Sequence, residues 1–325
     1  MKNRLNILII LVFIFSSCSD FSGNEDAVEA SLKPAPVTRT TTPPTSERTY
    51  YDLKGVTYGN NTFVAVGNDG TVFTSSDDGA TWDNGTSGTD RDLSEIAYGN
   101  STFVAVGQSG KHLLSSDNGA TWDNGTWSDS DWVTGVAFGN NTFIGVSSTY
   151  LTKSTDNGAN WVRACSGVRV YDMAFGNNKF VGSGAEGAIQ ISDNGSGCST
   201  PSGSGSGTTE ETLYGITFGN NRFLTVGSDG WLSITNDNGN NFSPLIIPTG
   251  ASHLYSTAYG NNIFVTVGNK SVVVSNNDGS SNPILKENTL SFNDVTFGNG
   301  VFVAVGNDEI IYTSTDGDTW TKVYP

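Results

Sequence analysis

The stretch that decides the fold runs from Tyr58 to Trp82 and reads YGNNTFVAVGNDGTVFTSSDDGATW. It opens on an aromatic-Gly-Asn tripeptide and continues through an apolar run, Thr62–Gly67, to a turn at Asn68-Asp69-Gly70. A second apolar run, Thr71–Ser75, precedes the Asp-rich segment that ends in Trp82. Short apolar runs bounded by Gly, Asn and Asp are typical of β-strands joined by tight turns, and helical periodicity is absent.

The aromatic-Gly-Asn tripeptide recurs seven times along the chain. The steps between successive copies are 40, 40, 37, 43, 41 and 38 residues, and the glycines are Gly59, Gly99, Gly139, Gly176, Gly219, Gly260 and Gly298. A period near 40 residues with four short strands per unit is the signature of a propeller blade. The sequence therefore predicts an all-β fold: a single seven-bladed β-propeller of four-stranded antiparallel blades over residues 49–325. A ring is favoured over a linear array because each blade covers the apolar faces of its neighbours.

The hairpin that ends each unit resembles the Asp-box, or BNR repeat, Ser-x-Asp-x-Gly-x-Thr-Trp. Two units match in full, with Ser75, Asp77, Gly79, Thr81 and Trp82 in the first and Ser115, Asp117, Gly119, Thr121 and Trp122 in the second. Units three, five and seven match in part, whereas unit four has Cys198 where Trp is expected and unit six has Asn277 where Asp is expected. We interpret these aspartates as structural, because a short Asp side chain caps the backbone amides of its own turn.

The first eighteen residues indicate export and lipid anchoring. Lys2 and Arg4 precede an apolar core that is too short to span a membrane, and Ser16 and Ser17 lead to Cys18. This arrangement resembles the lipobox of bacterial lipoproteins, with Phe15 where that family usually has Leu. The resemblance implies a signal peptide at 1–17, a Cys18 that carries fatty acyl chains such as palmitate, and a bacterial outer-membrane location. Ordinary secretion is the alternative. The Pro- and Thr-rich stretch to residue 48 is expected to be a disordered tether.

The net charge, the cysteines and the histidines indicate which partners, disulfides and metals to expect. A net charge of -16 argues against nucleic acid as a partner, because phosphates repel it. An exported chain can form disulfides, so Cys165 and Cys198 are the expected pair, with two free buried thiols as the alternative. The two histidines form no metal-spaced cluster with the cysteines, and we expect no metal, no cofactor and a monomer.

Aligning the seven units on their glycines shows which residues face the mouth of the ring. Five residues before each glycine, three successive units carry Tyr171, Tyr214 and Tyr255. One residue later, units two, four and seven carry Glu95, Asp172 and Asp294. The sequence predicts a mouth with a tyrosine arc and an acidic lining that binds a protein or a glycan. The alternative is that the tyrosines pack between blades and the acids face water.

Catalysis is the competing function. Asp-box families include sialidases, which the resemblance associates with six blades and a triad of arginines. Here the candidate arginines, Arg91, Arg163 and Arg169, come from neighbouring segments instead of from around the ring. A glycoside hydrolase using Glu95, Asp172 or Asp294 as acid and base stays open as the alternative. The repeats also resemble seven-bladed photosystem assembly factors, which implies protein binding. We therefore expect a non-enzymatic binding scaffold with no catalytic residues.

Overall fold

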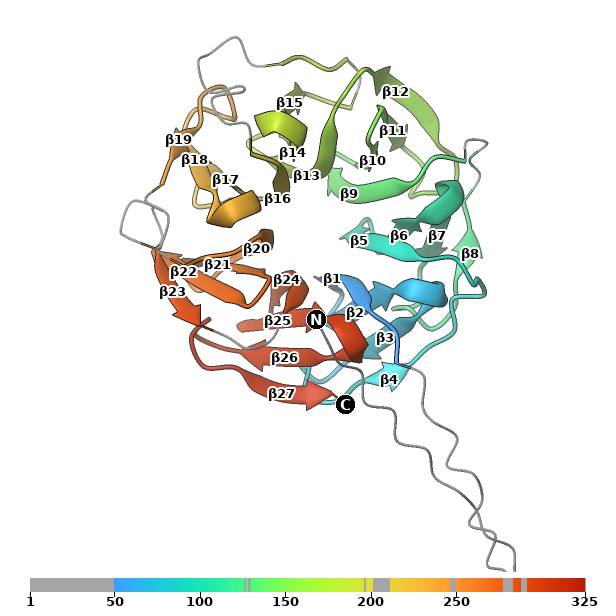
Figure 1. Ribbon diagram of the computed structural model, residues 1–325. Coiled ribbons are helices and arrows are strands. Elements are labelled where there is room, and N and C mark those ends of the chain that lie inside the picture. Colours follow the sequence, from blue (N-terminus) through green and yellow to red (C-terminus); the bar gives the residue numbers. More distant parts are fainter. Residues whose placement is uncertain are drawn as a thin grey trace, which may run out of the picture. The chain divides into compact units, whose positions relative to one another are not determined.

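The computed structural model describes residues 50–125, 127, 130–195, 197–200, 211–245, 250–276, 283–287 and 291–324. The signal peptide at 1–17, Cys18 and the whole of the tether to residue 48 lie outside these residues, as does Asn277. The predicted seven-bladed propeller is confirmed: seven antiparallel sheets, each formed by consecutive strands, surround a central axis (Figure 1). No helix in the described part of the chain is long and apolar enough to cross a membrane.

Each blade is a meander that runs from the axis outward. The innermost strands are β1 (Leu53–Gly59), β5 (Leu93–Gly99), β9 (Val133–Gly139), β13 (Val170–Gly176), β16 (Leu213–Gly219), β20 (Leu254–Gly260) and β24 (Phe292–Gly298). The second strands are β2 (Thr62–Gly67), β6 (Thr102–Gly107), β10 (Thr142–Ser147), β14 (Lys179–Gly184), β17 (Arg222–Gly227), β21 (Ile263–Gly268) and β25 (Val301–Gly306).

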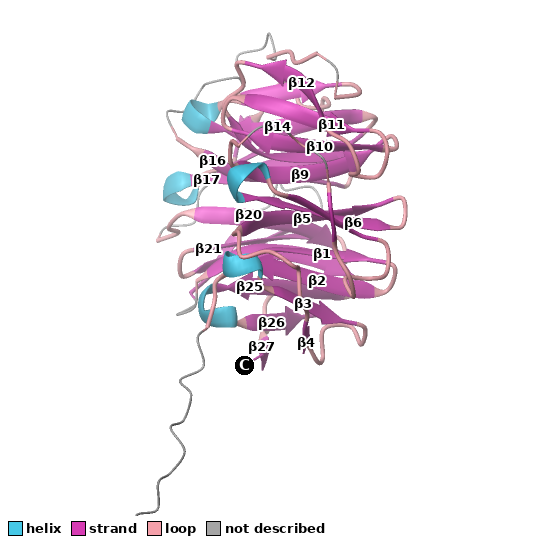
Figure 2. Ribbon diagram, turned by 90° about the vertical axis from the view of Figure 1, so that its right-hand side faces the viewer, coloured by secondary structure: helices cyan, strands magenta, loops and turns pink. Residues whose placement is uncertain are grey.

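The third strands are mostly buried, whereas the residues described in the outermost strands are mostly exposed. The third strands are β3 (Val72–Ser75), β7 (His112–Ser115), β11 (Tyr150–Ser154), β15 (Ile189–Ser192), β18 (Leu232–Thr235), β22 (Ser271–Asn276) and β26 (Ile311–Ser314). The outermost strands are β4 (Asp83–Asn84), β8 (Asp123–Asn124), β12 (Val162–Ser166), β19 (Ser243–Pro244), β23 (Ile284–Glu287) and β27 (Thr321–Tyr324). Five short 3-10 turns gather on one face of the ring (Figure 2): η1 (Asn68–Gly70), η2 (Gln108–Gly110), η3 (Ala185–Gly187), η4 (Ser228–Gly230) and η5 (Asn307–Glu309).

The core lies between blades instead of inside any one of them. In β2, every residue is buried, because neighbouring blades cover both faces of the strand. Phe63 and Ala65 pack toward blade 7 with Val303, whereas Val64 and Val66 pack toward blade 2. Clusters of this kind occupy all seven junctions of the described ring. Because side chains alternate between the two faces of a strand, each second strand contributes residues to the clusters on both sides of its blade.

The aromatic-Gly-Asn motif has one role per residue. At all seven junctions the aromatic ring of one blade lies over the motif glycine of the preceding blade, where an added Cβ would come within 2.0 to 2.1 Å of the ring's Cγ. The same ring also packs against the Phe of its own second strand; Tyr58 and Phe63 have centroids 4.6 Å apart. The Asn at position 60 has φ near +47°, a left-handed conformation that Asn tolerates, and begins the two-residue turn.

That Asn also joins neighbouring blades on the face opposite the 3-10 turns. The Asn60 Nδ2 donates to Asn118 Oδ1 at 2.8 Å, and Asn299 Nδ2 donates to Asp78 Oδ1 at 2.7 Å. Asn118 and Asp78 belong to the Asp-containing hairpins, so these hairpins share a face with the Gly-Asn turns. Within its own hairpin, Asp77 accepts hydrogen bonds from the Thr81 hydroxyl and amide, which lower its pKa. Both carboxylate oxygens of Asp77 therefore accept hydrogen bonds from within its own turn.

The ring closes without exchanging a strand between its ends. Blade 1 consists of β1 to β4 and blade 7 of β24 to β27, both in chain order. The Glu309 amide donates to the Tyr51 carbonyl at 2.8 Å, and Asn293 Nδ2 donates to the Leu53 carbonyl at 2.7 Å. The last strand adds an aromatic contact, because Tyr324 lies 4.8 Å from Phe73 between centroids. The closing junction therefore uses the same face packing as the other six.

Blade 4 departs from the expected four strands. The sequence predicts a fourth strand that starts at Cys198, but the described residues contain only a single bridge there. Ile191 and Ser199 exchange two backbone hydrogen bonds, of 2.8 and 3.0 Å. Two residues later the chain reaches Pro201, which has no amide hydrogen to continue the pairing.

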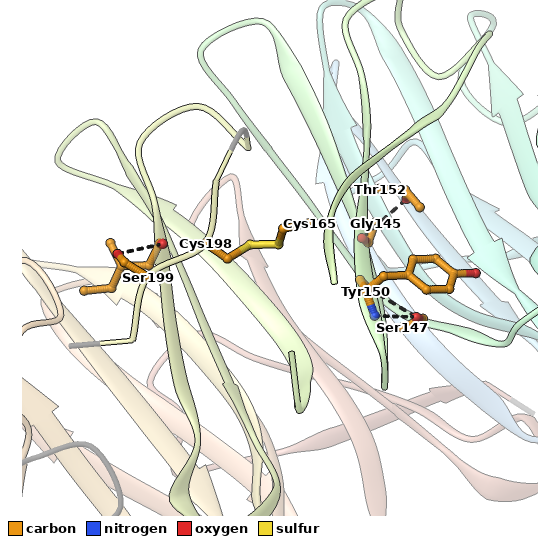
Figure 3. Close-up of a disulfide and its surroundings, with 8 residues drawn as sticks. Gly145, Ser147, Tyr150, Thr152, Cys165, Cys198 and Ser199 are labelled. Carbon is orange, nitrogen blue, oxygen red and sulfur yellow. Dashed lines mark hydrogen bonds between the residues drawn. A yellow bond between two sulfur atoms is a disulfide. The ribbon is translucent and has the colours of Figure 1, made fainter. Parts of the chain in front are cut away.

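A disulfide between Cys165 and Cys198 holds this segment to blade 3 (Figure 3). The two Cα atoms are 6.1 Å apart and 33 positions apart in sequence. Cys165 comes from β12, and both cysteines pack against a cluster that contains Val168 and Met173. In the chain-entropy picture, closing a loop of this size stabilises the fold by about 3 to 4 kcal/mol. The covalent link thus offsets the outer strand that blade 4 lacks among the described residues.

The aromatic-over-glycine contact predicts a sharp intolerance to one methyl group. Gly139→Ala should lower the free energy of unfolding by about 3 kcal/mol or prevent folding, because its Cβ would meet the Phe175 ring. The measurement is urea unfolding followed by circular dichroism. The matched control is Gly85→Ala, whose Cβ would lie 3.5 Å from Val72, an ordinary contact, and which should unfold like wild type. Equal stability of the two variants would contradict the packing argument.

Candidate functional site

The mouth of the ring is shaped by a bulge in every innermost strand. In each first strand one residue has no partner on the second strand; the unpaired residues are Lys54, Ser94, Thr134, Tyr171, Tyr214, Tyr255 and Asn293. A bulge re-aims side chains and frees a backbone amide. The two positions that the sequence analysis assigned to the mouth are these unpaired residues and the residues that follow them. They lie near the face that carries the 3-10 turns.

The structure brings the three predicted tyrosines together on blades 4, 5 and 6. The rings of Tyr214 and Tyr255 meet edge to face with centroids 5.7 Å apart. Partial burial raises the pKa of Tyr214, and the nearby Tyr255 and Tyr171 add to the rise. His253 joins the group, with its ring 6.2 Å from that of Tyr214 and its Nδ1 accepting a hydrogen bond from the Asp229 amide. We call Tyr171, Tyr214, Tyr255 and His253 the tyrosine cluster.

The three predicted carboxylates lie one position further in and interact with one another through space. Burial and the charges of Asp294 and Asp172 raise the pKa of Glu95 well above its usual range. Burial raises the pKa of Asp172 to about 7 and that of Asp294 to about 6. The Asp294 side chain is buried, whereas Glu95 and Asp172 keep part of their surface exposed. We call these three residues the central acids.

Two of the central acids bind backbone amides of the following blade. Asp172 Oδ2 accepts from the Ile216 amide at 2.9 Å, across the blade 4 to blade 5 junction. Asp294 Oδ2 accepts from the Val56 amide at 2.7 Å, across the closing junction, and its Oδ1 accepts from Ser256. Glu95 Oε1 accepts from its own neighbour, Ile96, at 2.8 Å. The carboxylates therefore accept hydrogen bonds from backbone amides of the innermost strands, each of which forms the inner edge of its sheet.

Space at the centre explains the glycines that alternate with these acids. A Cβ at Gly55 would lie 2.8 Å from Glu95 Oε1, and one at Gly215 would lie 2.5 Å from the Tyr255 carbonyl. Larger side chains are therefore excluded from these two positions. Across the described residues, no group of three or more His, Cys, Asp or Glu side chains is arranged to hold a metal ion.

A pocket on the other half of the mouth was missed by the sequence analysis. It has a volume of about 420 Å³ and is lined by Lys54, Ser94, Trp132 and Asn293, with Leu93 and Asp92. Trp132 is 48% exposed, which is unusual for an indole, and its Nε1 donates to Ser94 Oγ at 2.5 Å. We call this the Trp132 pocket.

The sequence analysis did not predict Trp132 or His253 as residues of the mouth, yet both stand at the same position in the alignment of the seven units. Seven residues before each motif glycine the chain has Asp52, Asp92, Trp132, Arg169, Thr212, His253 and Ser291. This lead-in position stands at the lip of the mouth, and only one unit places a large aromatic residue there.

The candidate arginines do not converge. Arg169 pairs with Glu186 at 2.6 Å on the exposed surface, and Arg91 lies 3.9 Å from its neighbour Asp90. Arg163 belongs to the outer strand β12, where its guanidinium lies 4.2 Å from the centroid of Tyr150. The arrangement offers no cradle of three arginines for a carboxylate. The chemistry that the mouth offers is hydrogen bonding and aromatic contact.

The described residues thus form a seven-bladed β-propeller whose mouth presents polar and aromatic side chains. No known protein-family profile matches the chain, and no curated protein matches its sequence. Solved structures do match. One described as "YCF48 bound to D1 peptide" has a TM-score of 0.66 and 17% identity, covering 81% of this chain and 93% of that one. YCF48 from Cyanidioschyzon merolae matches at 0.63 and 16%, covering 81% and 95%.

A WD40 propeller domain, that of Doa1, has a TM-score of 0.64 and 19% identity, covering 82% of this chain and 93% of that one. At such identities the likeness establishes the fold alone.

The central acids predict an unusual pH dependence. A carboxyl whose folded pKa is raised binds its proton more tightly in the folded state, so stability rises as pH falls from about 8 toward 5. Asp172→Asn should reduce this rise by about 1 kcal/mol, half of what a folded pKa of about 7 would give over this pH range, because the Asp172 side chain keeps part of its surface exposed. Urea unfolding of both proteins at pH 5, 6, 7 and 8 measures the difference. Parallel curves for the two proteins would show that Asp172 titrates normally.

Proposed function

We propose that this chain is an exported, lipid-anchored propeller that binds a partner polypeptide at its mouth and catalyses no reaction. The observation that carries the proposal is the tyrosine cluster. Tyrosine presents a large, rigid surface with a polar tip, and such residues dominate the energy of protein interfaces. The cluster is partly exposed, and its Tyr171 directly precedes the central acid Asp172 in the strand, so the cluster suits an extended segment that carries basic residues.

The structural neighbours support a binding role. One neighbouring propeller was solved with a peptide bound, as the words "YCF48 bound to D1 peptide" state. The partner of this chain need not be related to that peptide, because the acidic mouth here sets its own preference. A net charge of -16 favours a basic partner and steers its approach.

The hydrolase alternative gains no support from the mouth. A glycoside hydrolase needs one carboxyl that gives a proton and another that acts as base or nucleophile on the same bond. Here Asp172 and Asp294 accept hydrogen bonds from the backbone of the next blade. Their raised pKa values follow from burial within the ring, and the same carboxylates hold adjacent blades together.

Binding at the tyrosine cluster predicts a loss that spares the fold. Tyr214→Ala should weaken capture of the partner at least tenfold, since truncating a central aromatic at an interface costs about 2 kcal/mol. Partners are captured from the membranes and envelope extract of the source cell, and the affinity of the dominant one is then measured. Val162→Ala, which truncates an exposed side chain on the outer strand β12, is the control. Equal capture by all three proteins would overturn the proposal, as would unfolding of the Tyr214 variant.

Anchoring makes a separate prediction. We propose that Cys18 is acylated after removal of residues 1–17 and that the anchor holds the propeller at the outer membrane. Cys18→Ser should abolish labelling by radioactive palmitate and move the protein from the membrane fraction to the soluble fraction. Labelling that persists in this variant would remove lipid anchoring from the proposal and leave the binding mouth unaffected.

A further inference from the structure

The Trp132 pocket differs from the tyrosine cluster in both place and chemistry. It lies over blades 7, 1 and 2 with its wall from blade 3, whereas the tyrosines come from blades 4, 5 and 6. Its volume of about 420 Å³ falls in the range of small-molecule sites, about 300 to 1,000 Å³. Its lining includes Leu93, which is fully buried.

The indole of Trp132 is held in a fixed orientation while much of it stays in water. Its Nε1 donates to Ser94 on the neighbouring blade, which restrains rotation of the ring. The exposed fraction is 48%, whereas Trp82 and Trp161 are exposed by only 8% and 5%. A restrained, exposed indole beside a pocket offers a flat apolar surface whose electron-rich face attracts polarised C–H groups.

The polar groups around the pocket present donors and acceptors side by side. Both amide hydrogens of Asn293 are used, by the Leu53 carbonyl and by Asn307, which leaves its carbonyl oxygen as the group to accept from a ligand. Lys54 donates to Asp52 at 3.1 Å and keeps a third of its side chain exposed, so further ammonium hydrogens are available. The Ser94 hydroxyl, which accepts from the indole, has its own hydrogen to donate.

We propose that the Trp132 pocket binds a neutral sugar ring, stacked on the indole and hydrogen-bonded by Ser94, Asn293 and Lys54. Sugar hydroxyls both donate and accept, and the C–H face of a pyranose is apolar, so one ligand satisfies both kinds of lining. An apolar side chain would leave these polar groups without partners. An acidic sugar is disfavoured because Asp92 lines the pocket and Asp52 already neutralises Lys54.

The test uses the whole purified protein and four probes: maltotriose, cellotriose, triacetylchitotriose and 3′-sialyllactose. Binding is measured by titration calorimetry and by protection of tryptophan fluorescence from acrylamide, a quencher that reaches exposed indoles. At least one neutral probe should bind and protect. Trp132→Ala should reduce its affinity at least tenfold, and Trp132→Phe, which keeps a ring but loses the Ser94 contact, should reduce it less.

Controls separate this site from polypeptide binding, on which it does not depend. Tyr214→Ala should leave sugar affinity unchanged, and Trp132→Ala should keep the wild-type unfolding midpoint, since the indole is exposed. Absence of binding by all three neutral probes would overturn the proposal. Preference for sialyllactose would also overturn it, as would sugar binding that survives Trp132→Ala. Loss of polypeptide capture in Trp132→Ala without any sugar binding would instead assign the pocket to the polypeptide site.

Discussion

The ring depends on the contact between an aromatic ring on one blade and a bare glycine on the preceding blade. Because an added Cβ would come within 2.1 Å of the ring at each junction, the contact fixes how closely adjacent innermost strands approach. The same aromatic residue packs on the Phe of its own blade, so one side chain couples the interior of a blade to its neighbour. Repeated around the axis, this contact makes the closing junction equivalent to the others, and no exchanged strand is needed.

One face of the ring has a structural role, and the other forms the mouth. On one face the Gly-Asn turns and the Asp-containing hairpins bind each other through short side-chain hydrogen bonds, and these aspartates are occupied by their own turns. On the other face the bulges turn side chains into the mouth. Structural regularity is therefore concentrated away from the mouth, where the sequence is free to differ from blade to blade. That freedom produces the tyrosine cluster on blades 4 to 6 and the Trp132 pocket on blades 7 to 3.

The central acids show how a binding surface and a structural role overlap. Asp172 and Asp294 bind amides of the next blade and hold their charge at a cost, because burial opposes ionisation. At neutral pH a pKa of about 6 leaves Asp294 mostly ionised and a pKa of about 7 leaves Asp172 about half protonated, so the negative potential that they give the mouth grows as the pH rises. A propeller of this kind can attract a basic partner through its field and recognise it through the aromatic and polar groups at the lip.

The repeat in the sequence determined the architecture. A glycine that admits an aromatic ring and an Asn that adopts a left-handed turn recur about every 40 residues, which is the length of a four-stranded blade. Alignment of those repeats also placed Tyr171, Tyr214 and Tyr255 in adjacent blades. Tertiary structure decided the rest. Whether Glu95, Asp172 and Asp294 approach one another depends on how closely the innermost strands surround the axis. The hydrogen bond between Trp132 and Ser94 joins residues 38 positions apart on different blades. Among the described residues, the segment next to the single bridge of blade 4 is tied to blade 3 by a disulfide that joins cysteines 33 positions apart. Local sequence specifies turns and strands, whereas the distances between blades exist only once the ring has closed.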